Sequence, residues 1–173
     1  LEAYRQGMHN RVIRTSMTMK RIFDLARKET RRVVFAEGEE EMVLQTAQQA
    51  VEEGIAYPIL IGRRAVIERR LASLGLSLRL DEDCRVVDPQ DNPDREAHYA
   101  AFYQRAKRRG FTPAEARVHI RGSATGLAAV LLRTGEADAM ISGTIGRYRS
   151  HLDQIELIVG RARGVEHMAA MTA

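Results

Sequence analysis

The chain has 173 residues, of which 45% are apolar and 29% are charged, and its formal net charge is +4. This composition excludes a disordered chain, and no apolar run approaches the roughly 20 residues that a transmembrane helix needs. The single cysteine, Cys84, excludes an internal disulfide, and the sequence has no secretory signal pattern. We therefore expect a globular protein of the cytoplasm.

The positive charge is concentrated at the start of the chain. Residues 1–32 hold nine Lys or Arg and three acids, a net charge of +6, which leaves −2 for the remainder. Apolar residues recur there at helical spacing in two stripes: Tyr4, Met8 and Val12, then Ile22, Phe23 and Ala26. These stripes favour two amphipathic helices with a solvated basic face. A basic nucleic-acid-binding module is the alternative, but aromatic side chains do not interleave with the arginines as stacking platforms would. We expect neither nucleic acid nor a membrane as partner.

From Arg31 onward, strand and helix signals alternate. Short apolar runs predict strands over 33–36, 59–61, 84–87 and 137–141. Longer periodic segments predict helices over about 39–53, 65–74, 94–109, 112–121, 124–132 and 150–159. Thr112, Pro113 and Glu115 form a capping-box start, and Asp94 is a candidate N-cap. Strands separated by helices predict an α/β fold, a three-layer parallel Rossmann-like sheet with helices on both faces.

The stretch from Glu136 to Thr144 is the strongest candidate for a ligand-binding site. Its apolar run, 137–141, predicts a buried strand in a central position, and Ser142, Gly143 and Thr144 predict a sharp turn before the last helix. Ligands of open α/β sheets bind at the carboxyl ends of strands. We therefore expect these three small residues to lie near any ligand.

Common catalytic and metal-binding motifs are absent. No GxGxxG follows a strand, and there is no P-loop. The five histidines have no metal-ligand spacing and are interpreted as surface or packing residues: His9, His98, His119, His151 and His167. Glu37 and Glu39–Glu41 suit a solvated helix start better than general acids. Ser142 is interpreted as a turn residue, because no base stands beside it. The prediction is no catalytic residue and no metal site.

Three segments carry a resemblance to a known family. Residues 31–39 (RRVVFAEGE), 56–62 (AYPILIG) and 135–143 (GEADAMISG) resemble the phosphate acetyl/butyryltransferase family. Residues 141–148 (ISGTIGRY) with His151 and Leu152 resemble one subgroup, the phosphotransacetylase-like C-terminal region of large NADP-dependent malic enzymes. Residues 19–27 resemble the helix that joins their malic-enzyme part to this region. The resemblance implies an isocitrate/isopropylmalate dehydrogenase-like sheet with an N-terminal helical extension.

The sequence departs from the working transferases of that family. They carry a His-Ser/Thr-Thr-Ala-Asp-Thr-Val-Arg stretch soon after Ser-Gly, where this chain has residues 146–153 (GRYRSHLD). The position of the family's CoA-facing Arg falls on Asp153, whose carboxylate repels a phosphate. The family's Ser, Arg and Asp that act on the acyl group lie in a second domain, which we expect to begin near the end of this chain.

The resemblance implies regulation rather than turnover. We expect a non-catalytic sensor of acetyl-CoA and a homo-oligomerisation module attached to a malic-enzyme part, which would use NADP and Mg²⁺ or Mn²⁺; the chain itself needs no cofactor. Half of an active phosphate acetyltransferase is the alternative. The expected organisation is a linker at 1–30, a first α/β domain at 31–160, and the start of a second domain at 161–173. Candidate ligand-binding residues are Ser142, Gly143, Thr144, Arg147, Arg149 and Arg121.

Overall fold

The computed structural model describes residues 19–166, and its centre is a parallel sheet of four strands in the order β3-β2-β1-β4. The strands are β1 (Arg31–Phe35), β2 (Ala56–Ile61), β3 (Arg85–Val87) and β4 (Ala139–Ile141). Every pairing is parallel, and β1 lies between β2 and β4. The predicted parallel α/β sheet is therefore confirmed.

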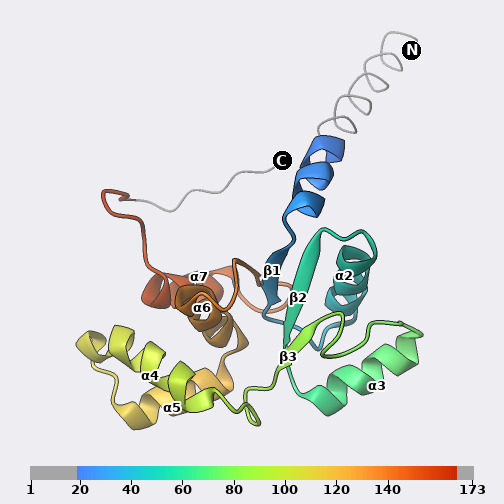
Figure 1. The fold of residues 1–173 in the computed structure, drawn as a ribbon. Helices are drawn as coiled ribbons and strands as arrows, with labels where there is room; N and C mark the ends of the chain where they lie inside the picture. Colours follow the sequence, from blue (N-terminus) through green and yellow to red (C-terminus); the bar gives the residue numbers. More distant parts are fainter. Residues whose placement is uncertain (1–18, 167–173) are drawn as a thin grey trace, which may run out of the picture.

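Helices cover both faces of the sheet (Figure 1). One layer consists of α2 (Glu41–Glu52) and α3 (Arg64–Leu74). The other consists of α4 (Arg95–Ala106), α5 (Pro113–Gly122), α6 (Ala124–Thr134) and α7 (Tyr148–Ile158), with a short 3₁₀ turn, η1 (Lys107–Arg109). The helices that separate and follow the strands in the sequence thus form two layers, one on each face of the sheet.

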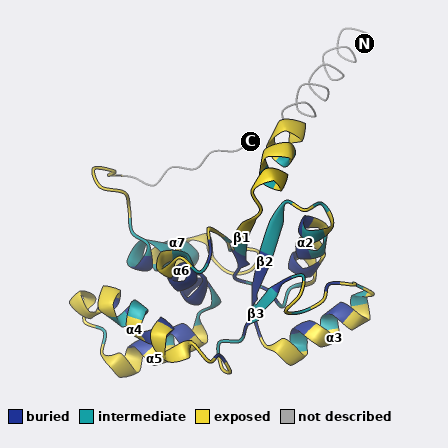
Figure 2. Ribbon diagram, viewed as in Figure 1, coloured by how far each residue is buried: buried dark blue, intermediate teal, exposed yellow. Residues whose placement is uncertain are grey.

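The alternation of strand side chains builds two separate cores. Successive residues of a strand point to opposite faces. Val34 and Ile59 therefore pack against α4–α7, whereas Phe35 and Leu60 pack against α2 and α3. Figure 2 shows the helix faces toward the sheet in dark blue and the outer faces in yellow. The sheet is thus apolar on both sides, as a doubly covered parallel sheet must be.

Strand β4 corrects one expectation. The predicted strand over 137–141 is shorter, and among residues 19–166 it is an edge strand that pairs only with β1. Ala137 is buried, but Ala139 is exposed and Ile141 is 50% exposed. The prediction of a buried central strand was wrong for this part of the chain, because an apolar run of five residues does not reveal how many neighbours the strand has.

A helix over residues 19–28 precedes β1 and points away from the sheet (Figure 1). Phe23 and Ala26 of the predicted stripe are half-buried, whereas Ile22 is 49% exposed. Arg27 joins the end of this helix to the end of α2, because its Nε donates to the carbonyl of Glu53, the C-cap of α2, at 2.7 Å. The first predicted stripe and residues 167–173 of the expected second-domain start at 161–173 lie outside the described residues. Within them, no helix has the length and apolar character to cross a membrane.

The starts of α5 and α4 differ in how they are capped. The predicted capping box at Thr112 is present: the Thr112 side chain accepts from the Glu115 amide, and the Glu115 carboxylate accepts from the Thr112 amide. Asp94 holds the N-cap position of α4, but its side chain makes no capping hydrogen bond and instead lies 3.5 Å from Arg85. The Asp94 carboxylate, which the sequence predicted to cap α4, thus pairs with the Arg85 guanidinium instead.

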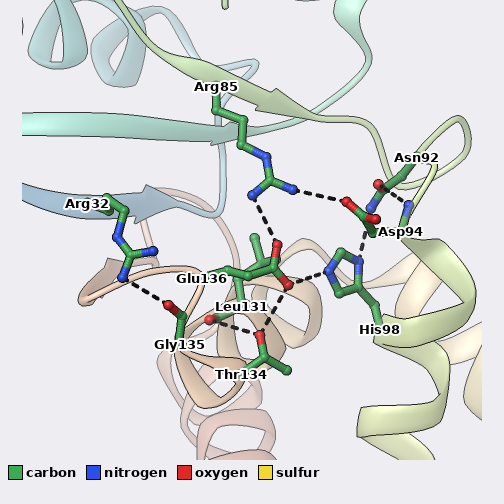
Figure 3. Close-up of polar contacts among 9 residues, drawn as sticks. All are labelled: Arg32, Arg85, Asn92, Asp94, His98, Leu131, Thr134, Gly135 and Glu136. Atoms are coloured by element: carbon green, nitrogen blue, oxygen red, sulfur yellow. Dashed lines mark hydrogen bonds and ion pairs between the residues drawn. The ribbon is translucent and has the colours of Figure 1, made fainter.

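A polar cluster ties the strands together at their amino-terminal ends (Figure 3). The Glu136 carboxylate accepts from His98 Nε2 at 2.8 Å and from Arg85 at 3.0 Å. Asn92 Oδ1 accepts from the Asp94 amide, so Asn92 Nδ2 must donate to His98 Nδ1, at 3.0 Å. Both ring nitrogens of the buried His98 are thus hydrogen-bonded within the fold, which makes it a packing histidine as predicted. Burial alone would raise the pKa of Glu136, but the hydrogen bonds from His98 and Arg85 outweigh it and lower that pKa.

His119 packs in an aromatic cluster between α4 and α5. Its ring stacks on Phe102 at a centroid distance of 4.9 Å and meets the edge of Phe111 at 5.6 Å. His119 Nε2 is buried and has no hydrogen-bond partner among the described residues. Burial therefore lowers the pKa of His119 below its usual value of 6.5.

We predict that His119→Phe reduces the loss of stability in mild acid. The unfolded chain protonates His119 below about pH 6.5 while the folded chain resists, so its contribution to stability is present above that pH and lost as the pH falls. The variant keeps the ring packing and gains about 1 kcal/mol at pH 7.5, because it removes an unsatisfied polar atom. Urea unfolding of both proteins at pH 7.5 and 5.5 measures the difference. All other titrating groups are shared, so equal pH slopes would contradict the assignment.

Candidate functional site

A pocket of about 280 Å³ lies at the carboxyl-terminal edge of the sheet. All four strand ends contribute to it, together with the junction of α5 and α6. Its lining residues are Ala36, Glu37, Glu39, Glu40, Ile61, Gly62, Arg63, Pro89, Gln90, Arg121, Gly122, Ala124 and Ile145. This is the place where open α/β sheets bind ligands. Its mixture of apolar side chains and a few charged groups is typical of a small-molecule site.

Glu39 closes one side of the pocket by binding the start of α3. Its carboxylate accepts from the Arg63 amide at 2.8 Å and from the Arg63 guanidinium at 2.9 and 2.8 Å. The hydrogen bond from the Arg63 side chain lowers the pKa of Glu39, so this group is a weak base. The prediction that Glu39–Glu41 form a solvated helix start was wrong for Glu39. The first helical residue of α2 is Glu41, and Glu40 is its N-cap.

The approach of β1's end to β2 requires small residues. The Gly38 amide donates to the Ile61 carbonyl at 3.0 Å, and a Cβ on Gly38 would lie 2.8 Å from that oxygen. A Cβ on Gly62 would lie 2.6 Å from the Glu39 side chain. The glycines thus let the Glu39 carboxylate reach the Arg63 amide, and this forms one wall of the pocket.

Glu37 and His151 hold the loop that follows β4. The Glu37 side chain is only 8% exposed, and its carboxylate accepts from the Gly143 amide at 3.0 Å. His151 Nε2 donates to the Ile145 carbonyl at 2.8 Å, and its Nδ1 lies 2.7 Å from the Thr125 hydroxyl. Since Ile145 lines the pocket, His151 fixes part of the pocket wall. The sequence reading missed this role, because His151 has no local partner pattern.

The structure separates the six predicted ligand-binding residues. Arg121 lines the pocket, at the end of α5. The loop residues 142–144 lie beside it, with Gly143 bound to Glu37, but they are not part of the lining. Arg147 is the N-cap of α7, and Arg149 pairs with Asp153 at 2.8 Å on the exposed face of that helix. Sequence analysis did not predict a role for two polar pocket residues, Arg63 and Gln90, which lie two residues after β2 and three residues after β3.

Two further features bear on chemistry at this edge. Cys84 is fully buried, and burial raises the pKa of its thiol to about 12, so it does not supply a thiolate at neutral pH. Between residues 19 and 166 no group of three His, Cys, Asp or Glu side chains is arranged to hold a metal ion. The pocket therefore offers hydrogen bonds, charge and apolar surface.

Comparison with known proteins identifies a matching family and several relatives. The phosphate acetyl/butaryl transferase family matches residues 17–173. An NADP-dependent malic enzyme of Haemophilus influenzae is 41% identical over 99% of this chain, and a phosphate acetyltransferase of Synechocystis is 29% identical over 82% of it. The chain spans 23% and 20% of the lengths of these two relatives. In the malic enzymes the matching part is the C-terminal phosphotransacetylase-like region.

A solved structure shares the fold. A phosphotransacetylase from Streptococcus pyogenes superimposes with a TM-score of 0.75 and 24% identity, over 86% of this chain and 45% of that one. This likeness concerns the fold alone, and it confirms the sheet with helices on both faces. The match of the family over nearly the whole sequence decides the relationship: the chain belongs to the phosphate acetyl/butaryl transferase family.

Proposed function

We propose that this chain is a non-catalytic region that senses acetyl-CoA and contributes to assembly in an NADP-dependent malic enzyme. The 41% identity to a malic enzyme, which exceeds the 29% identity to a phosphate acetyltransferase, supports the malic-enzyme assignment. The parent would work in the cytoplasm as a homo-oligomer. NADP and Mg²⁺ or Mn²⁺ would serve its malic-enzyme part, and we assign neither to the residues described here.

The composition of the pocket lining supports the proposal that the chain senses a ligand without catalysing a reaction. Among the described lining residues there is no Ser, Thr, Cys, Lys or His side chain to act as a nucleophile. The Glu39 carboxylate is engaged by Arg63 and is a weak base. The described part of the lining thus has groups that bind and orient a ligand, and it lacks a hydroxyl, thiol, amine or imidazole for group transfer. Sensing needs only a difference in binding free energy between two states of the assembly.

The surroundings of Asp153 also support a non-catalytic role. This carboxylate stands where the working transferases that the chain resembles carry an Arg toward CoA, and it forms an ion pair with Arg149 at 2.8 Å. Both side chains are more than half exposed, so the pair adds little to stability. It does, however, neutralise the Arg149 charge that the sequence reading assigned to a CoA phosphate. Of the two arginines after β4 that were predicted to bind CoA phosphates, Arg149 is therefore already paired with a carboxylate.

We predict that the full-length protein binds acetyl-CoA without transferring its acetyl group. Calorimetric titration should show saturable binding, and acetyl-CoA should lower the rate of malate decarboxylation. Incubation with acetyl-CoA and phosphate should yield no acetyl phosphate above background. Turnover at about 1 s⁻¹ or faster, the lower end of ordinary enzyme rates, would instead establish the second candidate, an active phosphate acetyltransferase. The likeness to the Synechocystis enzyme is the observation that favours this candidate.

We further predict that His151→Ala weakens acetyl-CoA binding by roughly tenfold. The change frees the Ile145 carbonyl and the Thr125 hydroxyl, and a lost hydrogen-bond pair in a partly buried site costs about 1–2 kcal/mol. Ser150→Ala, on the exposed face of the same helix, is the matched control and should bind as the unaltered protein does. Titration of the three proteins checks this, and equal affinities would show that the loop after β4 does not shape the site.

A further inference from the structure

A second hollow lies next to the pocket, lined by residues of α4 and α5. This hollow also has a volume of about 280 Å³ and shares Gln90 and Arg121 with the first pocket. Its other lining residues are Arg95, Glu96, Tyr99 and Arg117. The two hollows are therefore adjacent, and Gln90 and Arg121 lie between them.

The two hollows differ in charge. The first pocket has three glutamates against two arginines, whereas the second hollow has three arginines against one glutamate. In the second hollow, Arg117 pairs with Glu96 at 3.0 Å. Within residues 19–166, Arg95 and Arg121 form no ion pair with the protein's own carboxylates. Two guanidinium groups at this end are thus free to bind an anion, and a guanidinium suits phosphate oxygens.

The anion-binding positions at the other end are already occupied. The start of α3 is bound by the Glu39 carboxylate, and the Gly143 amide by the Glu37 carboxylate. A phosphate placed there would meet these carboxylates and Glu40, and like charges at such distances repel. The first pocket instead offers uncharged surface from Ala36, Ile61, Pro89, Ala124 and Ile145. It fits the neutral end of a ligand.

We propose that the site binds an acyl thioester of a phosphorylated nucleotide carrier in one orientation. The phosphate-bearing end lies on Arg95, Arg117 and Arg121, and the acyl end points into the pocket at the carboxyl edge of the sheet. This rests on the acetyl-CoA sensing proposed above and adds the direction of the ligand. It also transfers the phosphate contacts from the loop after β4 to the surface of α4 and α5.

The test compares acetyl-CoA with acetyl-pantetheine, which lacks the nucleotide and its phosphates. Both are titrated into the full-length protein and into Arg95→Ala, Arg117→Ala and Arg121→Ala variants. Each variant should lose about tenfold or more in acetyl-CoA affinity, because a charge-assisted hydrogen bond contributes roughly that much. Arg95→Ala and Arg117→Ala should leave acetyl-pantetheine affinity unchanged, and this also shows that these variants are folded. In the unaltered protein, a higher salt concentration should lower the ratio of the acetyl-CoA affinity to the acetyl-pantetheine affinity, because salt screens the contacts between arginine and phosphate.

Two control variants test whether the loss of acetyl-CoA affinity is specific to the arginines of α4 and α5. Arg133→Ala removes an exposed Arg near the end of α6 that lines neither hollow, and it should change neither affinity. Arg149→Ala tests the rival position after β4. If Arg149→Ala abolishes the preference for acetyl-CoA and the α4–α5 variants keep it, the proposed orientation is wrong while sensing stands. If the unaltered protein binds neither compound, both proposals fail.

Discussion

The register of β4 on β1 is the constraint on which the candidate site depends. The Asp138 carboxylate accepts from the Arg32 amide at 2.9 Å and from its guanidinium at 2.8 and 3.1 Å, while the Asp138 amide donates to the Arg32 carbonyl at 2.8 Å. The Arg32 side chain lowers the pKa of Asp138 to about 2, so the pair stays ionised throughout the physiological range. Shifting this pairing by one residue would turn every β4 side chain to the opposite face. The turn after β4 would then no longer meet Glu37.

The two edges of the sheet use carboxylates in different ways. At the amino-terminal edge, Glu136 joins β3, α4 and α6, and its partners His98 and Arg85 come from distant parts of the chain. At the carboxyl-terminal edge, Glu37 and Glu39 bind backbone amides that would otherwise be available to an anionic ligand. The first arrangement holds the scaffold in place. The second uses up backbone amides at the pocket edge, and the proposed orientation assigns the phosphate contacts to the arginines of α4 and α5.

The sensing role proposed above requires a protein that binds a ligand without transforming it. A sensing site needs affinity and a geometry that depends on the state of the assembly, and the His151 contact with Ile145 couples α7 to the pocket wall. A family fold can thus keep its binding edge when its catalytic residues differ, because the edge is made by the backbone of the sheet.

The sequence alone determined the elements and their layering. Apolar runs of strand length, glycine stops such as Gly135 and the Thr112 capping box are local signals, and the structure contains each of them. Local signals also led to errors: the Glu39 run was read as a helix start, although its partner Arg63 lies 24 residues away. Gly143 and Glu37 are 106 residues apart and meet only because β1 and β4 are neighbours.

Strand order therefore decided what the sequence could not. An apolar run of five residues specifies a strand but not its place in the sheet, so the edge position of β4 emerged only from the pairing of β1 with both β2 and β4. Of the six predicted ligand-binding residues, only Arg121 on α5 lines the pocket within the described part of the chain, and its place there depends on how α5 and α6 pack on the sheet. Secondary structure is encoded in neighbouring residues, whereas a binding site is encoded in contacts between residues that the tertiary fold alone brings together.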